Sequence, residues 1–171
     1  MAALPTKPAS ESRVVLSQIM RLEDANPHGN VHGGVIMRLA DEAGALACVR
    51  HAKRPVVTVV MDSMTFNHPI HVGDVVTLTS RVTWAGRTSM EARVDVEAEN
   101  PLSGIRVHSN TAYLVYVALD DQGHPTSVPP VRSVTAEEKE EAERAEERQQ
   151  IRRARAGRSL PSHSANGQSH P

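Results

Sequence analysis

The residues that could do chemistry lie in one short stretch, where a glycine-rich loop opens into a helix. From Gly29 to Gly44 the sequence reads GNVHGGVIMRLADEAG. Its helical part is apolar on most of its circumference, which is typical of a helix surrounded by protein. Asp41 is therefore expected in a dry setting, where desolvation disfavours the charged form of a carboxylate. This leaves two interpretations: a buried acid that is paired with a donor, or a catalytic group.

The loop before this helix favours the catalytic interpretation. Gly33 and Gly34 allow a ligand to approach the backbone closely. The first N–H groups of a helix have no partner within it, and the helix dipole suits an anion or a polarised carbonyl there. His32 is expected to shape the loop. Such a loop, with Asp41 two turns further on, is suited to acyl transfer.

Composition excludes several classes of protein. The 171 residues fit one domain, and 19 Lys and Arg against 20 Asp and Glu give no basic field for nucleic acid. With 2 % aromatic residues, a base-stacking platform is not expected either. Cys48 is the single cysteine, which fits a reducing compartment and a small core residue. No signal-like or membrane-length apolar segment occurs, so a soluble, cytoplasmic protein is expected.

Hydrophobic periodicity predicts one long helix followed by several antiparallel strands. The helix should end near Ala52, because Pro55 follows. The apolar run 56–61 is typical of a central strand, and residues 90–99 alternate between an apolar and a charged face. One apolar helix beside a sheet with one dry face predicts an α+β domain in which the sheet wraps the helix. Strands are predicted over residues 13–22, 56–61, 76–84, 90–99 and 106–119.

The two ends of the chain are predicted to lie outside this domain. Residues 1–12 read as a flexible leader and 13–132 as the domain. Residues 133–156 form a charged helix with Thr135 as N-cap and Glu138 at the capping-box position. Its few apolar residues predict an exposed helix, whose basic end at 152–155 either is solvated or binds a phosphate. Residues 157–171 are predicted to be a disordered tail.

Several short motifs follow one another in a fixed order along residues 14–130. They are Asp24–Asn26, Gly29–Gly34, Asp41–Gly44, Arg50–His51, Val57–Asp62, Pro69–Asp74, Gly86–Glu91 and Gly123–Pro130. Together they resemble those of hotdog-fold acyl-CoA thioesterases of the cytosolic acyl-CoA hydrolase type. The resemblance implies a long helix wrapped by a curved antiparallel sheet. It also implies a homo-oligomer, a dimer that often assembles further into a hexamer, with active sites at the dimer interface.

The resemblance further implies which residues act on an acyl-CoA to release free fatty acid and CoA. Asp41 of one subunit would face Asn26 of the other. The thioester carbonyl would lie at the helix N-terminus, polarised by a main-chain N–H near Gly33 or Gly34. Asp41 would act as general base on water or attack directly, and Asn26 would orient the water or the carbonyl.

Coenzyme A is part of the substrate in this interpretation, so no cofactor is expected. The family implies that two segments hold the pantetheine and nucleotide parts of CoA. They are Val59, Val60 and Met61 in one strand, and Arg87, Thr88, Ser89 and Met90 around a turn.

Other interpretations have less support in the sequence. The pairs His28 with His32 and His68 with His71 lie in loops without further ligands, so no metal site is expected. No Gly-x-Ser-x-Gly elbow or Walker-type phosphate loop occurs. Two alternatives stay open: a non-catalytic hotdog module that binds acyl-CoA as sensor or carrier, and a hotdog dehydratase.

Overall fold

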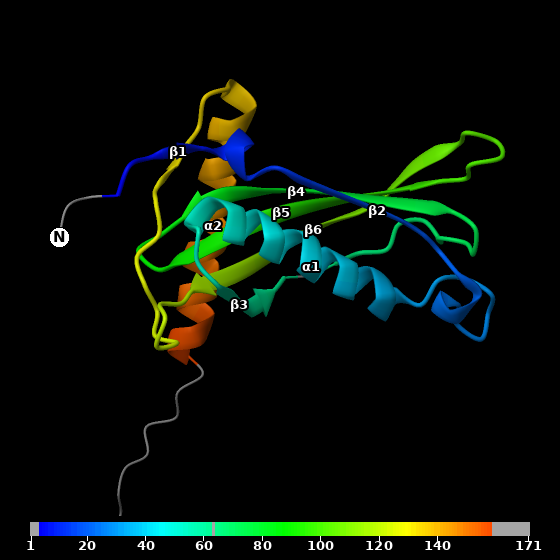
Figure 1. Ribbon diagram of the computed structural model, residues 1–171, viewed down its shortest axis with the longest axis horizontal. Coiled ribbons are helices and arrows are strands. Elements are labelled where there is room, and N and C mark those ends of the chain that lie inside the picture. Colours follow the sequence, from blue (N-terminus) through cyan, green and yellow to red (C-terminus); the bar gives the residue numbers. More distant parts are fainter. Residues whose placement is uncertain (1–3, 63, 159–171) are drawn as a thin grey trace, which may run out of the picture.

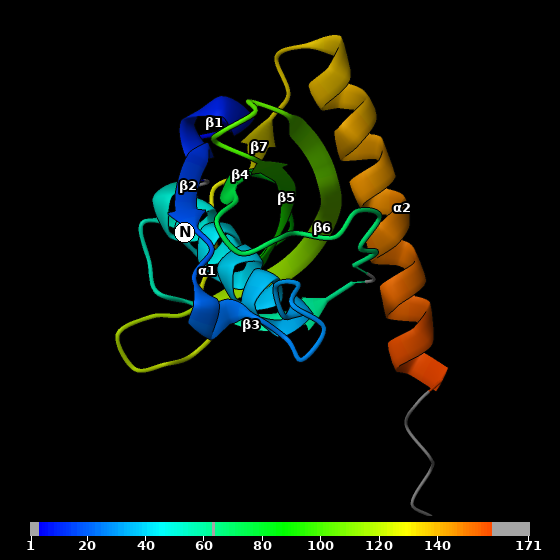
Figure 2. The same ribbon diagram turned by 90° about the vertical axis from the view of Figure 1, so that its right-hand side faces the viewer.

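The computed structural model describes residues 4–62 and 64–158. Helix α1 lies along the concave side of a curved sheet, and helix α2 lies on the outer side (Figures 1 and 2). The α+β class and the sheet wrapped around one helix are therefore confirmed. In chain order the elements are β1 Lys7–Pro8, η1 Ala9–Ser12, β2 Val14–Ile19, η2 Leu22–Asp24, α1 Gly33–Ala52, β3 Val56–Met61, β4 Val75–Ala85, β5 Ser89–Glu99, β6 Arg106–Ala118, β7 Val131–Arg132 and α2 Ala136–Arg158.

Five strands form the main sheet, in the order β2-β4-β5-β6-β3, with every neighbouring pair antiparallel. The pairs β3–β6, β4–β5 and β5–β6 each contain a register shift, and such bulges bend strands and increase the local twist. The sheet consequently curls around α1 (Figure 2). Its concave face and α1 share one apolar core, which includes Ile36, Leu39, Ala43, Leu78, Val82, Met90 and Leu114.

Local chemistry sets both ends of α1. His32 is the N-cap, and its Nδ1 accepts a hydrogen bond from the N–H of Gly34 at 2.9 Å. At the other end Lys53 adopts the left-handed conformation with φ 56°, and its N–H returns to the carbonyl of Val49. Cys48 is buried in the core, and burial raises the pKa of its thiol. The core interpretation of Cys48 is confirmed.

Three expectations about the ends and edges differ from the structure, and the first is the leader. Residues 7–12 are packed rather than loose, because β1 pairs in parallel with β7 and η1 lies against β4. The hydroxyl of Ser12 is buried and accepts the backbone N–H of Val82 at 2.9 Å. A short polar segment gives no hydrophobic period, so this docking leaves no mark in the sequence.

The second is the position of β3, which is an edge strand and not a central one. Val57, Val59 and Val60 are exposed on it. An apolar run without alternation indicates a strand that is covered on both faces. It does not distinguish a strand covered by the rest of its own chain from one covered by a second molecule.

The third is helix α2, which packs on the outer face of the sheet and is not fully exposed. The predicted capping box is present, since the N–H of Glu138 donates to Thr135 Oγ1 at 3.1 Å and the N–H of Thr135 to Glu138 Oε2 at 3.2 Å. Ala145 and Glu141 are nevertheless buried against the strands. The disordered tail was predicted over residues 157–171. Helix α2 extends to Arg158, and the rest of the tail, from residue 159 onward, lies outside the described residues.

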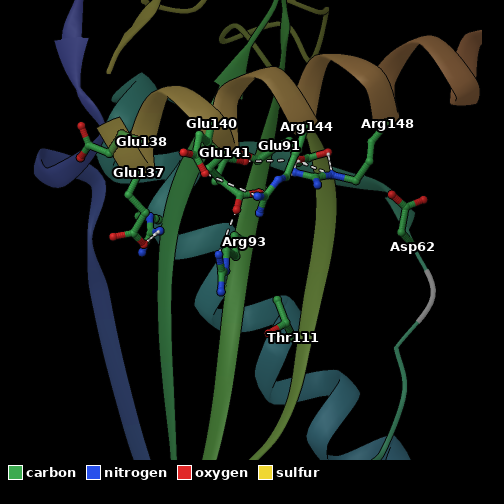
Figure 3. A network of polar contacts seen from close by, with 12 residues as sticks. Asp62, Glu91, Arg93, Thr111, Glu137, Glu138, Glu140, Glu141, Arg144 and Arg148 are labelled. Carbon is green, nitrogen blue, oxygen red and sulfur yellow. Dashed lines mark hydrogen bonds and ion pairs between the residues drawn. The ribbon is translucent and has the colours of Figure 1, made fainter. Parts of the chain in front are cut away.

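Charged side chains hold α2 on the sheet (Figure 3). Glu91 of β5 is 0 % exposed, and Arg148 of α2 donates to it at 2.7 Å. Arg152 donates to Glu91 at 2.5 Å and also pairs with Asp62, beyond the end of β3. The basic end of α2 is thus tied to carboxylates, and Arg152 does not meet the expectation of a solvated cation.

Neither helix of the described chain has the length and the apolar composition that a membrane span requires.

Candidate active site

Asp41 lies two turns into α1, projects toward the edge strand β3 and is half-buried in the single chain. Its Oδ1 accepts a hydrogen bond from the Thr58 hydroxyl at 2.7 Å and one from the Tyr116 hydroxyl at 3.2 Å. The same Tyr116 hydroxyl lies 2.9 Å from the main-chain oxygen of Asp41. Oδ2 accepts no hydrogen bond from the described residues. The carboxylate is therefore held by one oxygen, and the other oxygen remains for a reactant.

The register of the sheet brings the two hydroxyls together. Thr58 on β3 is the direct partner of Tyr116 on β6, and the register shifts just beyond, at Val59. Both side chains meet Asp41 of α1, and Tyr116 also lies against Gly44. A Cβ on Gly44 would lie 2.4 Å from the Tyr116 hydroxyl oxygen, so only glycine admits the ring at this position.

The Tyr116 hydroxyl acts as a proton donor here. Burial, and then the negative charge of Asp41, raise the pKa of Tyr116 well above its usual value. The phenol consequently keeps its proton and donates it in hydrogen bonds to the Asp41 oxygens.

Asn26 is placed by the turn that it organises. Its Oδ1 accepts the backbone N–H of His28 at 2.9 Å and that of Asn30 at 3.3 Å. The carboxamide oxygen is thereby committed to the loop. What Asn26 can offer to a ligand is its NH₂ group, a hydrogen-bond donor.

The glycine loop provides one candidate amide rather than two. The N–H of Gly34 is taken by His32 Nδ1, whereas the N–H of Gly33 donates to no acceptor among the described residues. Gly33 lines a hollow of about 370 Å³ with Asn26, Ile36 and Phe66. A Cβ on Gly33 would approach the Phe66 ring to 3.3 Å, so the glycine keeps this hollow open.

The predicted site residues therefore form two separate groups. Asp41 lies eight residues beyond Gly33, which is about 12 Å along the axis of α1. One thioester carbonyl cannot contact the Asp41 carboxylate and the Gly33 amide of the same helix at once. A single subunit therefore does not bring Asp41 together with the amides that begin its own helix, although the sequence led us to expect this. We call Asp41, Thr58 and Tyr116 the acid half-site, and Asn26 with Gly33 the donor half-site.

The residues expected to hold CoA also lie in two separate places. Val59, Val60 and Met61 follow Thr58 on the exposed edge strand, next to the acid half-site. Arg87 and Thr88 lie in the β4–β5 turn and Ser89 begins β5. Arg87 lines a hollow of about 580 Å³ together with Arg54. The side chain of Met90 is 0 % exposed in the core, so it cannot contact a ligand.

Sequence reasoning does not assign functions to Thr58 and Tyr116. Thr58 lies inside one of the motifs that carry the resemblance, so its position is visible but its role is not. Tyr116 gives no local signal, since it reads as one more apolar position in a buried strand. Among the described residues no group of three or more His, Cys, Asp or Glu side chains could hold a metal ion.

Comparisons with known proteins place this arrangement in a family. A family model described as the thioesterase superfamily matches residues 28–105. An uncharacterized acyl-CoA thioester hydrolase of Bacillus subtilis is 40 % identical over 133 residues, covering 78 % of this chain and 77 % of its own.

Solved structures agree with the sequence comparison. An apo-hexameric acyl-CoA thioesterase has a TM-score of 0.86 at 37 % identity and covers 92 % of this chain and 100 % of its own. An acyl-CoA hydrolase from Staphylococcus aureus, in complex with butyryl coenzyme A, coenzyme A and its disulfide, has a TM-score of 0.84 at 34 % identity, covering 91 % and 94 %. The chain belongs to the hotdog-fold acyl-CoA thioesterases. The resemblance drawn from the motifs is confirmed, and the chain is an enzyme of the thioester hydrolase class.

Proposed function

We propose that this enzyme hydrolyses fatty acyl-CoA to free fatty acid and CoA at a site built from two subunits. The observation that carries the proposal is the acid half-site. Its carboxylate is fixed through Oδ1, while Oδ2 accepts no hydrogen bond from the part of the chain that the structure describes and lies beside an open sheet edge. Asn26 and the Gly33 amide of a second subunit complete the site. They supply hydrogen-bond donors for the thioester oxygen, which the acid half-site does not provide.

The surface around Asp41 supports a second copy of the chain as the missing part. Met37 on α1 and Val57, Val59 and Val60 on β3 are exposed apolar side chains; Val59 is 51 % exposed. An unprotected apolar edge strand is a template for pairing with another strand. Two such edges joined in a symmetric dimer would extend the sheet and cover these side chains. Relatives named as hexameric thioesterases support a further assembly into trimers of dimers.

Variants of the Staphylococcus aureus relative support the choice of residues. That protein has been solved with alanine in place of an asparagine, an aspartate and a threonine, which are 15 and 17 positions apart along its chain. The same spacings separate Asn26, Asp41 and Thr58 here. We assign these three residues to the reaction on that basis.

The chemistry follows from the two half-sites. Asp41 accepts a proton from a water molecule, and the water oxygen adds to the thioester carbonyl carbon. The negative charge that develops on the carbonyl oxygen is stabilised by the Asn26 NH₂ and the Gly33 N–H of the partner. When the tetrahedral intermediate collapses, the C–S bond breaks, the fatty acid leaves, and the thiolate of CoA takes the proton from Asp41.

The surface beside the site suits the rest of CoA. Val59, Val60 and Met61 offer an edge strand to the amide-containing pantetheine arm. Arg54 and Arg87 line a hollow at the other end of β3, and two guanidinium groups are suited to nucleotide phosphates. We place the enzyme in the cytoplasm, in keeping with its single, reduced cysteine.

The direct test is the variant Asp41→Asn. It keeps the shape of the side chain and an oxygen that accepts from Thr58 and Tyr116, but it removes the base. We expect acyl-CoA hydrolysis, measured as released thiol, to fall by at least about 100-fold while acyl-CoA binding persists.

The matched control is Glu42→Gln on the next residue of α1. Glu42 is an exposed carboxylate that pairs with Arg38 at 2.6 Å, away from the site, and its loss should leave the rate within about twofold. Hydrolysis by Asp41→Asn at the wild-type rate would remove Asp41 from the reaction. Tight binding without turnover by the wild-type protein would instead identify a sensor or carrier.

A further inference from the structure

We infer that Tyr116 is a positioning residue for Asp41: its hydroxyl, rather than its ring alone, fixes the reactive carboxylate. The inference rests on the proposed role of Asp41 and extends it to a residue on a different strand. In the proposed reaction Tyr116 contacts neither the water nor the thioester and acts through Asp41.

The geometry gives the hydroxyl a defined task. It lies 2.9 Å from the main-chain oxygen of Asp41 and 3.2 Å from Oδ1, so one phenol spans the backbone and the carboxylate of the same residue. This contact fixes the side chain relative to α1. Thr58 holds Oδ1 from the other side at 2.7 Å, and together the two donors leave Oδ2 as the oxygen for the water.

The fold makes specific room for this hydroxyl. The Tyr116 side chain is 0 % exposed, and its oxygen occupies the place where any side chain at position 44 would begin. A phenylalanine would fill the same core volume without this contact. Glycine at 44 is thus matched to the oxygen of Tyr116 and not only to close packing of the helix.

The surroundings of Asp41 contain few other groups that titrate. On α1 these are Cys48, buried and in the thiol form, and the exposed pair Arg38 with Glu42. From β3 Thr58 faces the carboxylate, and from β6 Tyr116 does. Strands β4 and β5 present apolar core side chains to α1, among them Leu78, Val82, Met90 and Ala92. Within the described residues Thr58 and Tyr116 are consequently the two side-chain donors to the Asp41 carboxylate.

Loss of the Tyr116 hydroxyl removes one of the two donors that hold Oδ1, so the carboxylate is less well oriented toward the water. We expect Tyr116→Phe to lower kcat about tenfold with KM within about twofold, the size expected for one hydrogen bond to a charged group. A role in packing alone would not confine the loss to kcat.

Tyr113 is the matched control, because it is the other tyrosine of the chain and lies on the same strand. Its ring lies under the Arg148 guanidinium at 3.7 Å, on the side of the sheet that faces α2. Tyr113→Phe should leave both kcat and KM unchanged. Gly44→Ala gives a second approach, since its Cβ displaces the Tyr116 hydroxyl; it should slow the wild type but add little to Tyr116→Phe.

The outcomes separate the two claims. A Tyr116→Phe enzyme with wild-type kcat, or with kcat and KM changed by similar factors, overturns the positioning role. If Tyr116→Phe does not fold, additive effects of Gly44→Ala and Thr58→Val on kcat overturn it as well. Full activity of Asp41→Asn would instead overturn the proposed function, whatever Tyr116 does.

Discussion

At the scale of single residues, the role of a polar side chain in this protein depends on the few partners that the fold brings to it. Asp41 and Glu42 are neighbours on α1, yet only Asp41 meets hydroxyls from two strands. Glu42 meets an arginine of its own helix in solvent. The difference in surroundings, and not in residue type, makes one of them a candidate base.

His51, near the end of α1, shows the same principle for stability. It is 1 % exposed, its Nε2 lies 2.8 Å from the Pro129 carbonyl oxygen, and its Nδ1 has no partner among the described residues. Burial lowers the pKa of His51, with a smaller contribution in the same direction from Lys7, against the opposing hydrogen bond to Pro129. The neutral ring is therefore the form that the folded protein accepts.

A pH dependence of stability follows. The unfolded chain takes up a proton at His51 near pH 6.5, whereas the folded protein does so only at lower pH. The stabilisation is thus complete above about pH 6.5 and is lost as pH falls toward the folded pKa, with a slope of at most about 1.4 kcal/mol per pH unit.

Urea unfolding at pH 7.5 and at pH 5.5 measures this slope. His51→Gln, which does not titrate, should show a smaller loss of unfolding free energy between the two pH values than the wild type. His68→Gln removes an exposed histidine and should retain the wild-type slope. Equal slopes for wild type and His51→Gln would show that His51 does not carry the effect.

At the scale of elements, α2 is a charged helix that depends on buried partners. Burial opposes the charged form of Arg148, but the hydrogen bonds and charge of Glu91 outweigh it and raise the pKa of Arg148. Arg93 extends the network, donating to Glu141 of α2 at 2.9 Å and to Asp95 of its own strand (Figure 3). A helix of this composition is solvated only where such partners are missing.

Arg148→Met should therefore destabilise the protein although it removes a charge from an apparently polar helix. Because Glu91 is fully buried and Arg152 still faces it, we expect a loss of about 3 kcal/mol in unfolding free energy. Arg144→Met is the control, since Arg144 pairs with Glu140 at 3.5 Å in solvent, and it should cost less than about 1 kcal/mol. Equal losses in the two variants would contradict the buried network.

The elements themselves were largely predictable. Periodicity gave α1 and the long strands within a few residues, because a period is a local property of the chain. It could not give the place of β3 in the sheet or the docking of α2. Those depend on partners far along the chain, such as Glu91 for Arg148, and composition alone does not reveal them.

The candidate site was predictable only in part, for the same reason. Asp41 stood out through the apolar helix around it, and Asn26 through the motif resemblance. Tyr116 joins Asp41 across 75 residues through the register of β3 on β6, which no local pattern encodes. The sequence left the amides of Gly33 and Gly34 as alternatives for the carbonyl, and it does not show that the His32 side chain accepts the N–H of Gly34.

At the scale of the whole molecule, one subunit contains both half-sites but does not join them. The donor half-site lies at the N-terminus of α1, and Asp41 lies about 12 Å further along the helix. The exposed apolar edge at β3 lies beside Asp41. A second copy seated there would bring its own Asn26 and Gly33 to this carboxylate, which gives two sites in each dimer.

Mixing two inactive variants tests this central claim most directly. The Asp41→Asn and Asn26→Ala variants should each be nearly inactive when prepared separately. The two are then unfolded together and refolded as a mixture. In a mixed dimer one site carries both substitutions and the other carries neither. With equal amounts and random pairing, thiol release from acyl-CoA should recover to about a quarter of the wild-type rate. No recovery, in mixed dimers shown to have formed, would mean that Asp41 and Asn26 of the same subunit act together and would contradict the shared site.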